Sequence, residues 1–210
     1  MGELEGKTIL EFGCGNGVMG AYYEDKNSVI SIEPDAQVLA ENQYDNVKQI
    51  CGNMNELKRI EDGYFDIILC HNVFEYANER QDIMKEFERL LKPDGMISIL
   101  KHNILGRVMQ MAVLLNNFEH ANDLLDGNYG AASQYGTIQY YQDEDLVEWA
   151  KGLKIIKVLG MRTFWDLQQN QDIHTDKEWQ SKMIELEQRV SDKDEFINIA
   201  FFHHVILEKR

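Results

Sequence analysis

Proline and cysteine are scarce in this chain of 210 residues, which holds only 2 and 3 of them. Cys14, Cys51 and Cys70 stand far apart without a CxxC pair, so neither a disulfide framework nor a zinc site is expected, and a reducing cytoplasm is the expected location. No apolar run approaches the roughly 18 residues that a membrane helix needs, and no signal-peptide pattern stands at the N-terminus. We therefore expect one globular domain over residues 1–210, with no membrane association and no metal.

Basic side chains are also few, with 21 Lys and Arg against 36 Asp and Glu, a net charge of −15 at pH 7. Phosphate contacts supply much of the affinity of proteins for nucleic acids, so a chain this acidic repels a polyanion unless basic residues gather locally. The charge therefore disfavours a nucleic-acid partner. No feature of the sequence indicates an oligomeric state.

The first 100 residues alternate short β-rich runs with helical stretches, a pattern typical of βαβ units that build a parallel sheet. "FDIILC" and "MISIL" are nearly continuous apolar runs, as strands buried on both faces require. The expected strands are Lys7–Phe12, Val29–Ile32, Val47–Cys51, Phe65–His71 and Met96–Leu100, and the expected helices are Val18–Glu24, Asp35–Gln43 and Glu79–Leu91, the last ended by "KPDG".

This alternation stops after Leu100. Residues 102–142 contain a helix candidate, "ILGRVMQMAVLLNNF", and a Gly- and Ser-rich passage, so we expect an insertion that binds the acceptor of a reaction. The later elements are a helix at Asp143–Lys151, a strand at Lys154–Leu159, a helix at Lys177–Val190 packed through Met183, Ile184, Leu186 and Val190, and a strand at Ile199–Leu207. The two late strands are expected to be antiparallel neighbours at the end of the sheet.

The stretch "EFGCGNGVMG" places Gly13, Gly15 and Gly17 between a strand and a helix, where a backbone turns tightly and approaches a ligand at the helix N-terminus. A GxGxxG pattern begins only at Gly15 and is weak evidence for a dinucleotide. Glu11 precedes the first glycine, and a carboxylate there tolerates a cationic ligand better than a diphosphate. Glu33, at the end of the second strand, is placed to bind ribose hydroxyls in either a dinucleotide or an adenosyl ligand.

Taken together and in this order, "LEFGCGNG", Glu33, "CGNMNEL", "FDIILCHNVFEY" and "RLLKPDGMISI" resemble the class I S-adenosylmethionine-dependent methyltransferases. The resemblance implies a Rossmann-like α/β fold with a doubly wound, mostly parallel seven-stranded sheet, an antiparallel edge strand and an insertion after the fifth strand. It also implies S-adenosyl-L-methionine as cofactor. The residues that it assigns to the donor are Glu11, Gly13, Cys14, Gly15 and Gly17 at the methionine end, Glu33 and Pro34 at the ribose, Asn53 and Met54 at the adenine, and His71 and Asn72 near the transferred methyl group.

The second half, with "KHNILGRVMQMAVLLNNFEH" and "GMRTFWDL", resembles the bacterial tRNA 5-carboxymethoxyuridine methyltransferases, which esterify a carboxylate on the wobble uridine. A lysine-rich loop of that family is replaced here by "DLLDGNYGAASQY". The acceptor is therefore left open between a modified nucleoside and a small molecule. A carboxylate acceptor needs only a cation to orient it, for which Arg162 is the candidate, whereas a hydroxyl or an amine needs a base, for which His102 or His71 is the candidate.

Two other interpretations remain beside methyl transfer. One is a regulatory module that binds S-adenosylmethionine without turnover, and the other is an oxidoreductase, which the carboxylate of Glu11 ahead of the loop opposes. Cys14, inside the loop, is expected to be a small buried filler, because no base stands next to it to form a thiolate.

Overall fold

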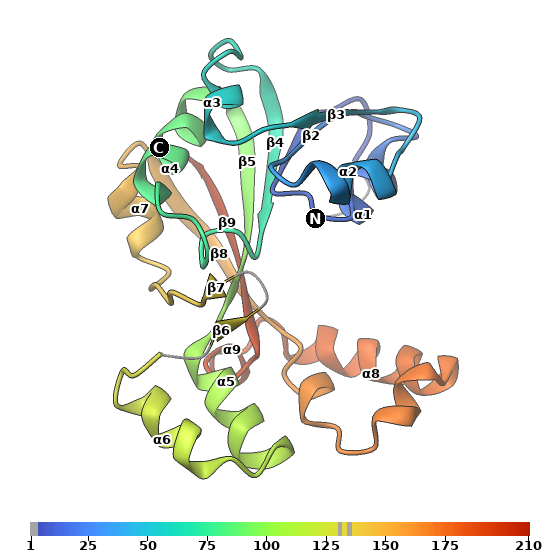
Figure 1. Cartoon of the computed structure of the whole chain (residues 1–210), viewed down its shortest axis with the longest axis vertical. Coiled ribbons are helices and arrows are strands. Elements are labelled where there is room, and N and C mark those ends of the chain that lie inside the picture. The colour runs from blue at the N-terminus through green and yellow to red at the C-terminus, as the bar shows by residue number, and fades with distance from the viewer. Residues whose placement is uncertain (1–3, 130–131, 134–135) are drawn as a thin grey trace. The chain divides into compact units, whose positions relative to one another are not determined.

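The computed structural model describes residues 4–129, 132–133 and 136–210. The chain divides into two compact units. The first unit consists of Met1–Ile99, Gln142–Ile156 and Ile206–Arg210, and the second of Leu100–Tyr141 and Lys157–Val205. Strands β5 (Leu91–His102), β8 (Leu153–Met161) and β9 (Phe202–Lys209) cross the boundaries between them (Figure 1). No helix in the described ranges is both long and apolar enough to pass through a bilayer.

The seven strands of the main sheet follow the order β3-β2-β1-β4-β5-β9-β8, and the sheet is mostly parallel with one antiparallel pair at its edge. This confirms the doubly wound fold and the antiparallel edge expected from the sequence. Strands β1 to β4 pair in parallel, with Leu10 opposite Ile30 on one side and Ile68 on the other. Their bounds are β1 Thr8–Phe12, β2 Ser28–Glu33, β3 Val47–Cys51 and β4 Phe65–His71.

Strands β1, β2 and β4 are buried on both faces, which explains their continuous apolar runs. Ile9 belongs to one core cluster with Val29, against which Met19 and Tyr23 of α1 (Val18–Tyr23) pack. Phe12 meets Phe87 of α4 (Arg80–Leu90) edge to face, with ring centroids 5.5 Å apart. The other helices of the first unit are α2 (Ala36–Glu41), α3 (Met54–Leu57) and α7 (Asp145–Trp149), the last packed on α4.

The second unit contains most of the predicted insertion. The apolar helix candidate forms α5 (Ile104–Met109), which continues directly into a π-helical turn η1 (Gln110–Leu114), and is followed by α6 (Phe118–Leu125). The remaining elements are the short strands β6 (Ala132–Ser133) and β7 (Gly136–Thr137), the 3-10 turns η2 (Trp165–Leu167) and η3 (Gln171–Thr175), and the helices α8 (Lys177–Val190) and α9 (Asp194–Ile197). Residues 130–131 and 134–135 of the expected insertion lie outside the described residues.

Three local expectations were wrong. Helix α4 ends at Leu90, one residue before the expected Leu91, and strand β5 starts at Leu91 instead of Met96, so "KPDG" lies within the strand. The last strand starts at Phe202 instead of Ile199. In α8 only Val190 of the expected apolar stripe is buried, and Ile184 and Leu186 are 52% and 43% exposed. The amphipathic spacing therefore predicted the helix correctly, but it did not show which surface the helix packs against.

Candidate functional site

The glycine loop follows β1 and leads into α1. Gly13, Gly15 and Gly17 have φ angles of 69°, 52° and 68°, in the left-handed region that favours glycine. The amide of Gly13 donates to the carbonyl of Ile32 at 2.8 Å, which brings the loop against the end of β2. A Cβ on Gly17 would lie 2.7 Å from the ring of Tyr44, so at this position the loop has no room for a side chain.

Glu33 ends β2 and holds the loop in place. Its Oε2 accepts from the Gly15 amide at 2.8 Å, and its Oε1 accepts from the Asp35 amide at 3.1 Å. Its carbonyl accepts from the Gly52 amide at 3.0 Å, after β3. The carboxylate therefore lies where the carboxyl ends of β1, β2 and β3 meet, the edge of an open α/β sheet at which ligands bind.

Glu11 is buried beneath the start of α1. One carboxylate oxygen accepts from the Gly20 amide at 3.0 Å and from the Ser31 hydroxyl at 2.9 Å. Burial raises the pKa of Glu11 above its usual value, the bonds to Ser31 and Gly20 act in the opposite direction, and the charge of Glu33 raises it further. A positively charged ligand nearby would favour the ionised form of this carboxyl group.

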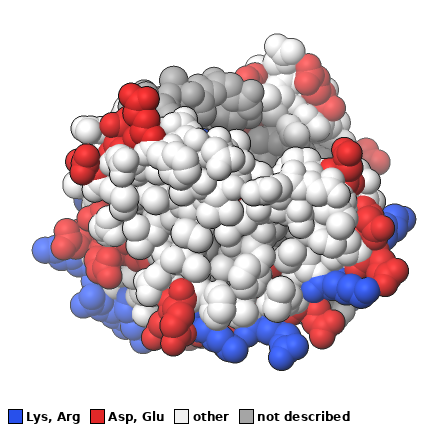
Figure 2. All heavy atoms as spheres, turned by 90° about the horizontal axis from the view of Figure 1, so that it is seen from below, with Lys and Arg blue, Asp and Glu red and all other residues white. Residues whose placement is uncertain are grey.

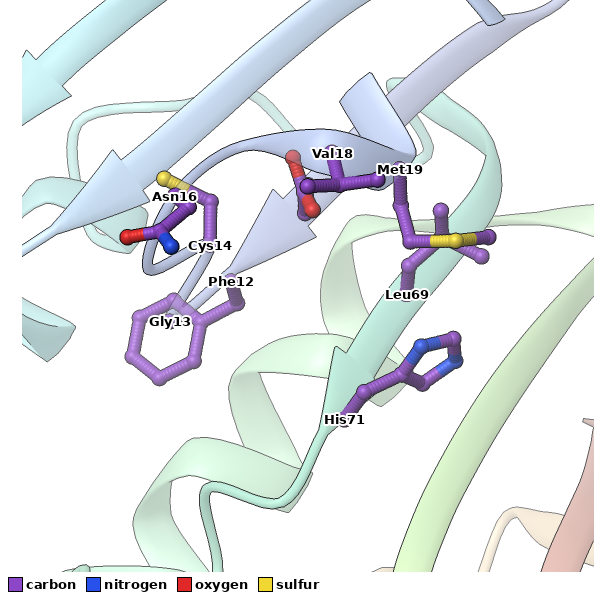
Figure 3. Close-up of a pocket in the computed structure, with 9 residues that line it drawn as sticks. Phe12, Gly13, Cys14, Asn16, Val18, Met19, Leu69 and His71 are labelled. Carbon is purple, nitrogen blue, oxygen red and sulfur yellow. The ribbon is translucent and has the colours of Figure 1, made fainter. Parts of the chain in front are cut away.

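A cavity of about 120 Å³ opens beside the loop (Figure 3). Of the residues assigned to the donor, Glu11, Gly13, Cys14 and His71 line it together. Figure 3 shows one group of lining side chains from the loop and another from α1 and β4; the whole lining is Glu11, Phe12, Gly13, Cys14, Asn16, Val18, Met19, Leu69 and His71. Burial, with the charges of Glu11 and Glu33, raises the pKa of the Cys14 thiol to about 12, so this thiol stays protonated at neutral pH.

The other residues assigned to the donor lie at neighbouring strand ends. Asn53 precedes α3 and caps it, accepting from the Asn55 amide at 3.0 Å. Met54 starts that helix, and the carbonyl of Pro34 accepts from a cysteine thiol at the end of β3. Asn72, which follows β4, has a left-handed backbone with φ 57°, and its buried Oδ1 has no hydrogen-bond partner among the described residues. An amide oxygen in this state fits a ligand that supplies a donor group.

His71 is fixed by a residue that the sequence analysis missed. Its Nε2 lies 3.0 Å from the hydroxyl of Ser98, a fully buried residue of the neighbouring strand β5. Ser98 stands within the run "MISIL", where a single serine gave no signal of its own. This hydrogen bond limits rotation of the ring that lines the cavity.

The two candidate catalytic residues belong to the second unit, where they flank the same pair of rings. The His102 ring lies 5.5 and 4.8 Å from the rings of Phe201 and Phe202, and the Arg162 guanidinium lies 5.8 and 5.4 Å from them. Arg162 also forms an ion pair with the buried Asp166. Lys101, the residue before His102, is also a cation of this unit, but it is buried and donates to the carbonyl of Tyr141.

The segment that carries Arg162 is held by Glu187 of α8. The carboxylate of Glu187 accepts from the amides of Thr163, Phe164 and Trp165 at 2.9, 2.8 and 3.0 Å. Three successive amides aimed at one carboxylate form a compact anion site. Sequence analysis could not find this contact, because the partners are more than 20 positions apart and the helix shows no pattern that singles out Glu187.

Acid is expected to destabilise the protein through His102 and His204. The pKa of both rings is lowered to about 4, mainly by burial, and for His102 also by the nearby charges of Arg107 and Arg162. The unfolded chain takes up these protons below about pH 6.5, whereas the folded chain does so only near pH 4, so stability is lost as pH falls through this range, by up to about 3 kcal/mol for each ring. Urea unfolding between pH 8 and 4 measures this loss.

Ring-proton NMR shows which histidines cause this loss of stability in acid. We expect the His102 signals to titrate near pH 4, and replacement of Arg162 by glutamine to raise the pKa of His102 because a neighbouring positive charge is removed. A midpoint near 6.5 in the native chain would contradict the buried, neutral ring.

Comparison with known proteins agrees with this geometry. Residues 10–99, which span the loop and the ends of β2 and β4, match the family described as "Methyltransferase domain". The ubiquinone biosynthesis O-methyltransferase of Coxiella burnetii is 25% identical over 170 residues, 75% of this chain and 68% of that protein. The thiol S-methyltransferase TMT1B of Rattus norvegicus is 25% identical over 103 residues, 45% of this chain and 42% of that protein.

Solved structures share the fold at low identity. An S-adenosylmethionine-dependent methyltransferase from Mesorhizobium loti superposes with a TM-score of 0.59 at 13% identity, over 100% of this chain and 94% of that one. A TehB-like S-adenosylmethionine-dependent methyltransferase from Corynebacterium glutamicum gives 0.55 at 17%, over 99% and 82%. The fold and the match over residues 10–99, a little less than half of the chain, support a methyltransferase of class I. The chain is an enzyme that takes its methyl group from S-adenosyl-L-methionine.

Proposed function

We propose that this enzyme methylates an oxygen atom of a small molecule. The observation that carries the proposal is the grouping of His102 and Arg162 around Phe201 and Phe202 in the second unit. Aromatic rings beside a guanidinium suit a flat or apolar molecule that carries an oxygen anion. The O-methyltransferase of Coxiella burnetii, similar over 75% of this chain, supports oxygen as the acceptor atom.

Arg162 and His102 would serve different acceptor groups, a carboxylate and a hydroxyl. A sulfonium methyl group is already activated, so the protein has mainly to orient the acceptor and exclude water. A carboxylate needs only a positive group, and Arg162 has five N–H donors, more than its pair with Asp166 uses. A hydroxyl must lose a proton, and the ring of His102 is the candidate acceptor; burial lowers its pKa to about 4, which makes it a weak base and favours a carboxylate as the acceptor group.

Methyl transfer tests this proposal directly. We expect the purified chain to transfer labelled methyl groups from S-adenosylmethionine to compounds below about 1 kDa in a cell extract, a size typical of small-molecule sites. The product is expected to be an ether or an ester. Replacement of Arg162 by alanine is expected to raise KM for an acidic acceptor at least tenfold, the loss of a charged hydrogen bond, whereas the same change at the exposed Arg59 leaves KM unchanged.

Other outcomes would replace the proposal with one of its competitors. A labelled thioether would place this enzyme with thiol methyltransferases. Binding of S-adenosylhomocysteine without transfer to any fraction would favour a regulatory module.

A modified tRNA is the alternative acceptor, and the likeness of "GMRTFWDL" and the segment after Lys101 to the tRNA carboxymethoxyuridine enzymes favours it. The net charge of −15 opposes it. Mass spectrometry of tRNA nucleosides from cells with and without the gene separates the two. Loss of the methyl ester at the wobble uridine would establish the tRNA acceptor, and unchanged ester levels would leave the small molecule.

A further inference from the structure

One surface of the second unit is apolar and is not needed for its own core. We call it the apolar face; it consists of five side chains on and between α5, η1 and α6, exposed by 40 to 62%: Leu105, Val113, Leu115, Phe118 and Leu125. Beneath it, Met111, Ala121 and Leu124 are buried and form the contact between these helices. The helices therefore have a complete core of their own, and the five exposed side chains add nothing to it.

Acidic residues are absent from most of this part of the chain. Between Asp94 and Glu119 there is none, although acids make up 36 of the 210 positions; Glu119, Asp123 and Asp126 follow in and just after α6. The basic residues there are Lys101, which is buried, and Arg107, which bonds Gln110. Figure 2 shows the face as a broad area almost free of charged side chains, with acidic and basic residues around its margin. An uncharged centre with a charged rim is the composition of a protein interface.

The exposed apolar area of this face also fits a contact between two proteins. Five large side chains, each about half exposed, present roughly 450 Å² of apolar surface, near the upper end for a monomer and large enough to suggest a function. A homodimer contact of standard size buries about 800 Å² on each partner, of which about 65%, or roughly 500 Å², is apolar. The exposed apolar area therefore matches what one half of such a contact requires.

We infer that a second copy of this chain covers the apolar face. Two chains of charge −15 repel each other wherever their acidic surfaces meet, and the centre of this face offers a contact with few carboxylates. A two-fold axis lets the same patch serve both partners, so one uncharged surface suffices. The inference concerns assembly and does not depend on which acceptor is methylated.

Sedimentation velocity on the full chain tests this inference. At about 100 µM, where a dimer with a micromolar Kd is almost fully formed, we expect twice the chain mass of 24.4 kDa. Replacing Phe118 or Leu115 by glutamate places two like charges against each other and is expected to return the chain to the mass of a monomer. Both side chains are more than half exposed, so neither change disturbs the core.

The matched control is Tyr22→Glu, an equally polar change at a side chain 75% exposed in the first unit, which should leave the dimer intact. Equal circular dichroism and melting temperatures of all variants show that folding is unchanged. A wild-type chain that stays monomeric at this concentration overturns the inference, as does a dimer that survives both glutamate variants. Binding of a monomeric chain to phosphatidylcholine vesicles, lost in Phe118→Glu, would overturn it in favour of a lipid surface.

Discussion

Replacing Gly106 by alanine is expected to destabilise the protein by about 3 kcal/mol, as overpacking of a buried contact together with loss of hydrogen bonds does. Gly106 is buried in α5, and a Cβ there would collide with the carbonyl oxygen of Ala200 and lie 2.6 Å from the Cα of Phe201. Asn103 holds the two segments at this distance: its amide donates to the Phe201 carbonyl at 3.0 Å and its side chain to the Ala200 carbonyl at 2.9 Å. Neither backbone can move away without breaking these bonds.

The direction of the change in stability distinguishes a close contact at Gly106 from an ordinary exposed helix position. At an exposed helical position, exchange of glycine for alanine stabilises by up to about 1 kcal/mol through helix propensity. In thermal unfolding, we expect the melting temperature of Gly106→Ala to fall by roughly 6 to 12 °C, the shift that 3 kcal/mol causes in a chain of this size. Asn122→Ala, an exposed position in the neighbouring α6, is the control and should melt at the wild-type temperature or slightly above it. A stabilised Gly106→Ala would contradict the close contact.

The elements that sequence could predict are those whose pattern is local. Strands β1, β2 and β4 were found nearly to the residue, because a strand buried on both faces is a continuous apolar run between turn residues. Helix α8 was found with its bounds from the spacing of its apolar residues, and the structure adds that the side chain of Asp176 caps it by accepting from the Trp179 amide. The donor loop was found because glycine is the residue that adopts positive φ without strain.

What sequence could not predict depends on partners far along the chain. The close approach at Gly106 joins α5 to residues almost 100 positions away, and Glu187 reaches back to the segment after Arg162. The exposed side of α8 was misjudged because apolar spacing says that a face is apolar and not what covers it. The roles of His102 and Arg162 in catalysis stay predictions, since geometry brings them to the same two rings without showing what they bind.

Replacing Glu33 by alanine is expected to weaken binding of S-adenosylhomocysteine by about 1 to 3 kcal/mol, or about 5- to 150-fold, the range for a hydrogen bond to a charged group. Glu33 stands at the end of β2, where a carboxylate can accept from ribose hydroxyls. Its bonds to the amides of Gly15 and Asp35 hold it there. Isothermal titration calorimetry measures the affinity directly.

The same variant also releases the amide of Gly15, so affinity could fall because the loop moves and not because ribose loses a partner. A thermodynamic cycle with the 2′,3′-dideoxy analogue of S-adenosylhomocysteine separates these causes. If Glu33 binds the hydroxyls, wild type should bind the analogue more weakly than the parent compound, and Glu33→Ala should bind both about equally. An equal loss for both ligands would show that Glu33 acts only through the loop.

The matched control is Glu41→Ala, which removes an exposed carboxylate at the end of α2 that accepts a hydrogen bond from the side chain of Gln37. It changes the net charge by the same amount, and its affinity for both ligands should equal that of wild type. A parallel loss in this control would mean that long-range charge, and not a contact at the end of β2, attracts the donor. Because exposed charges more than about 10 Å apart are screened at 0.1 M salt, repeating the titration at higher salt should abolish any loss in the control and leave most of the loss in Glu33→Ala.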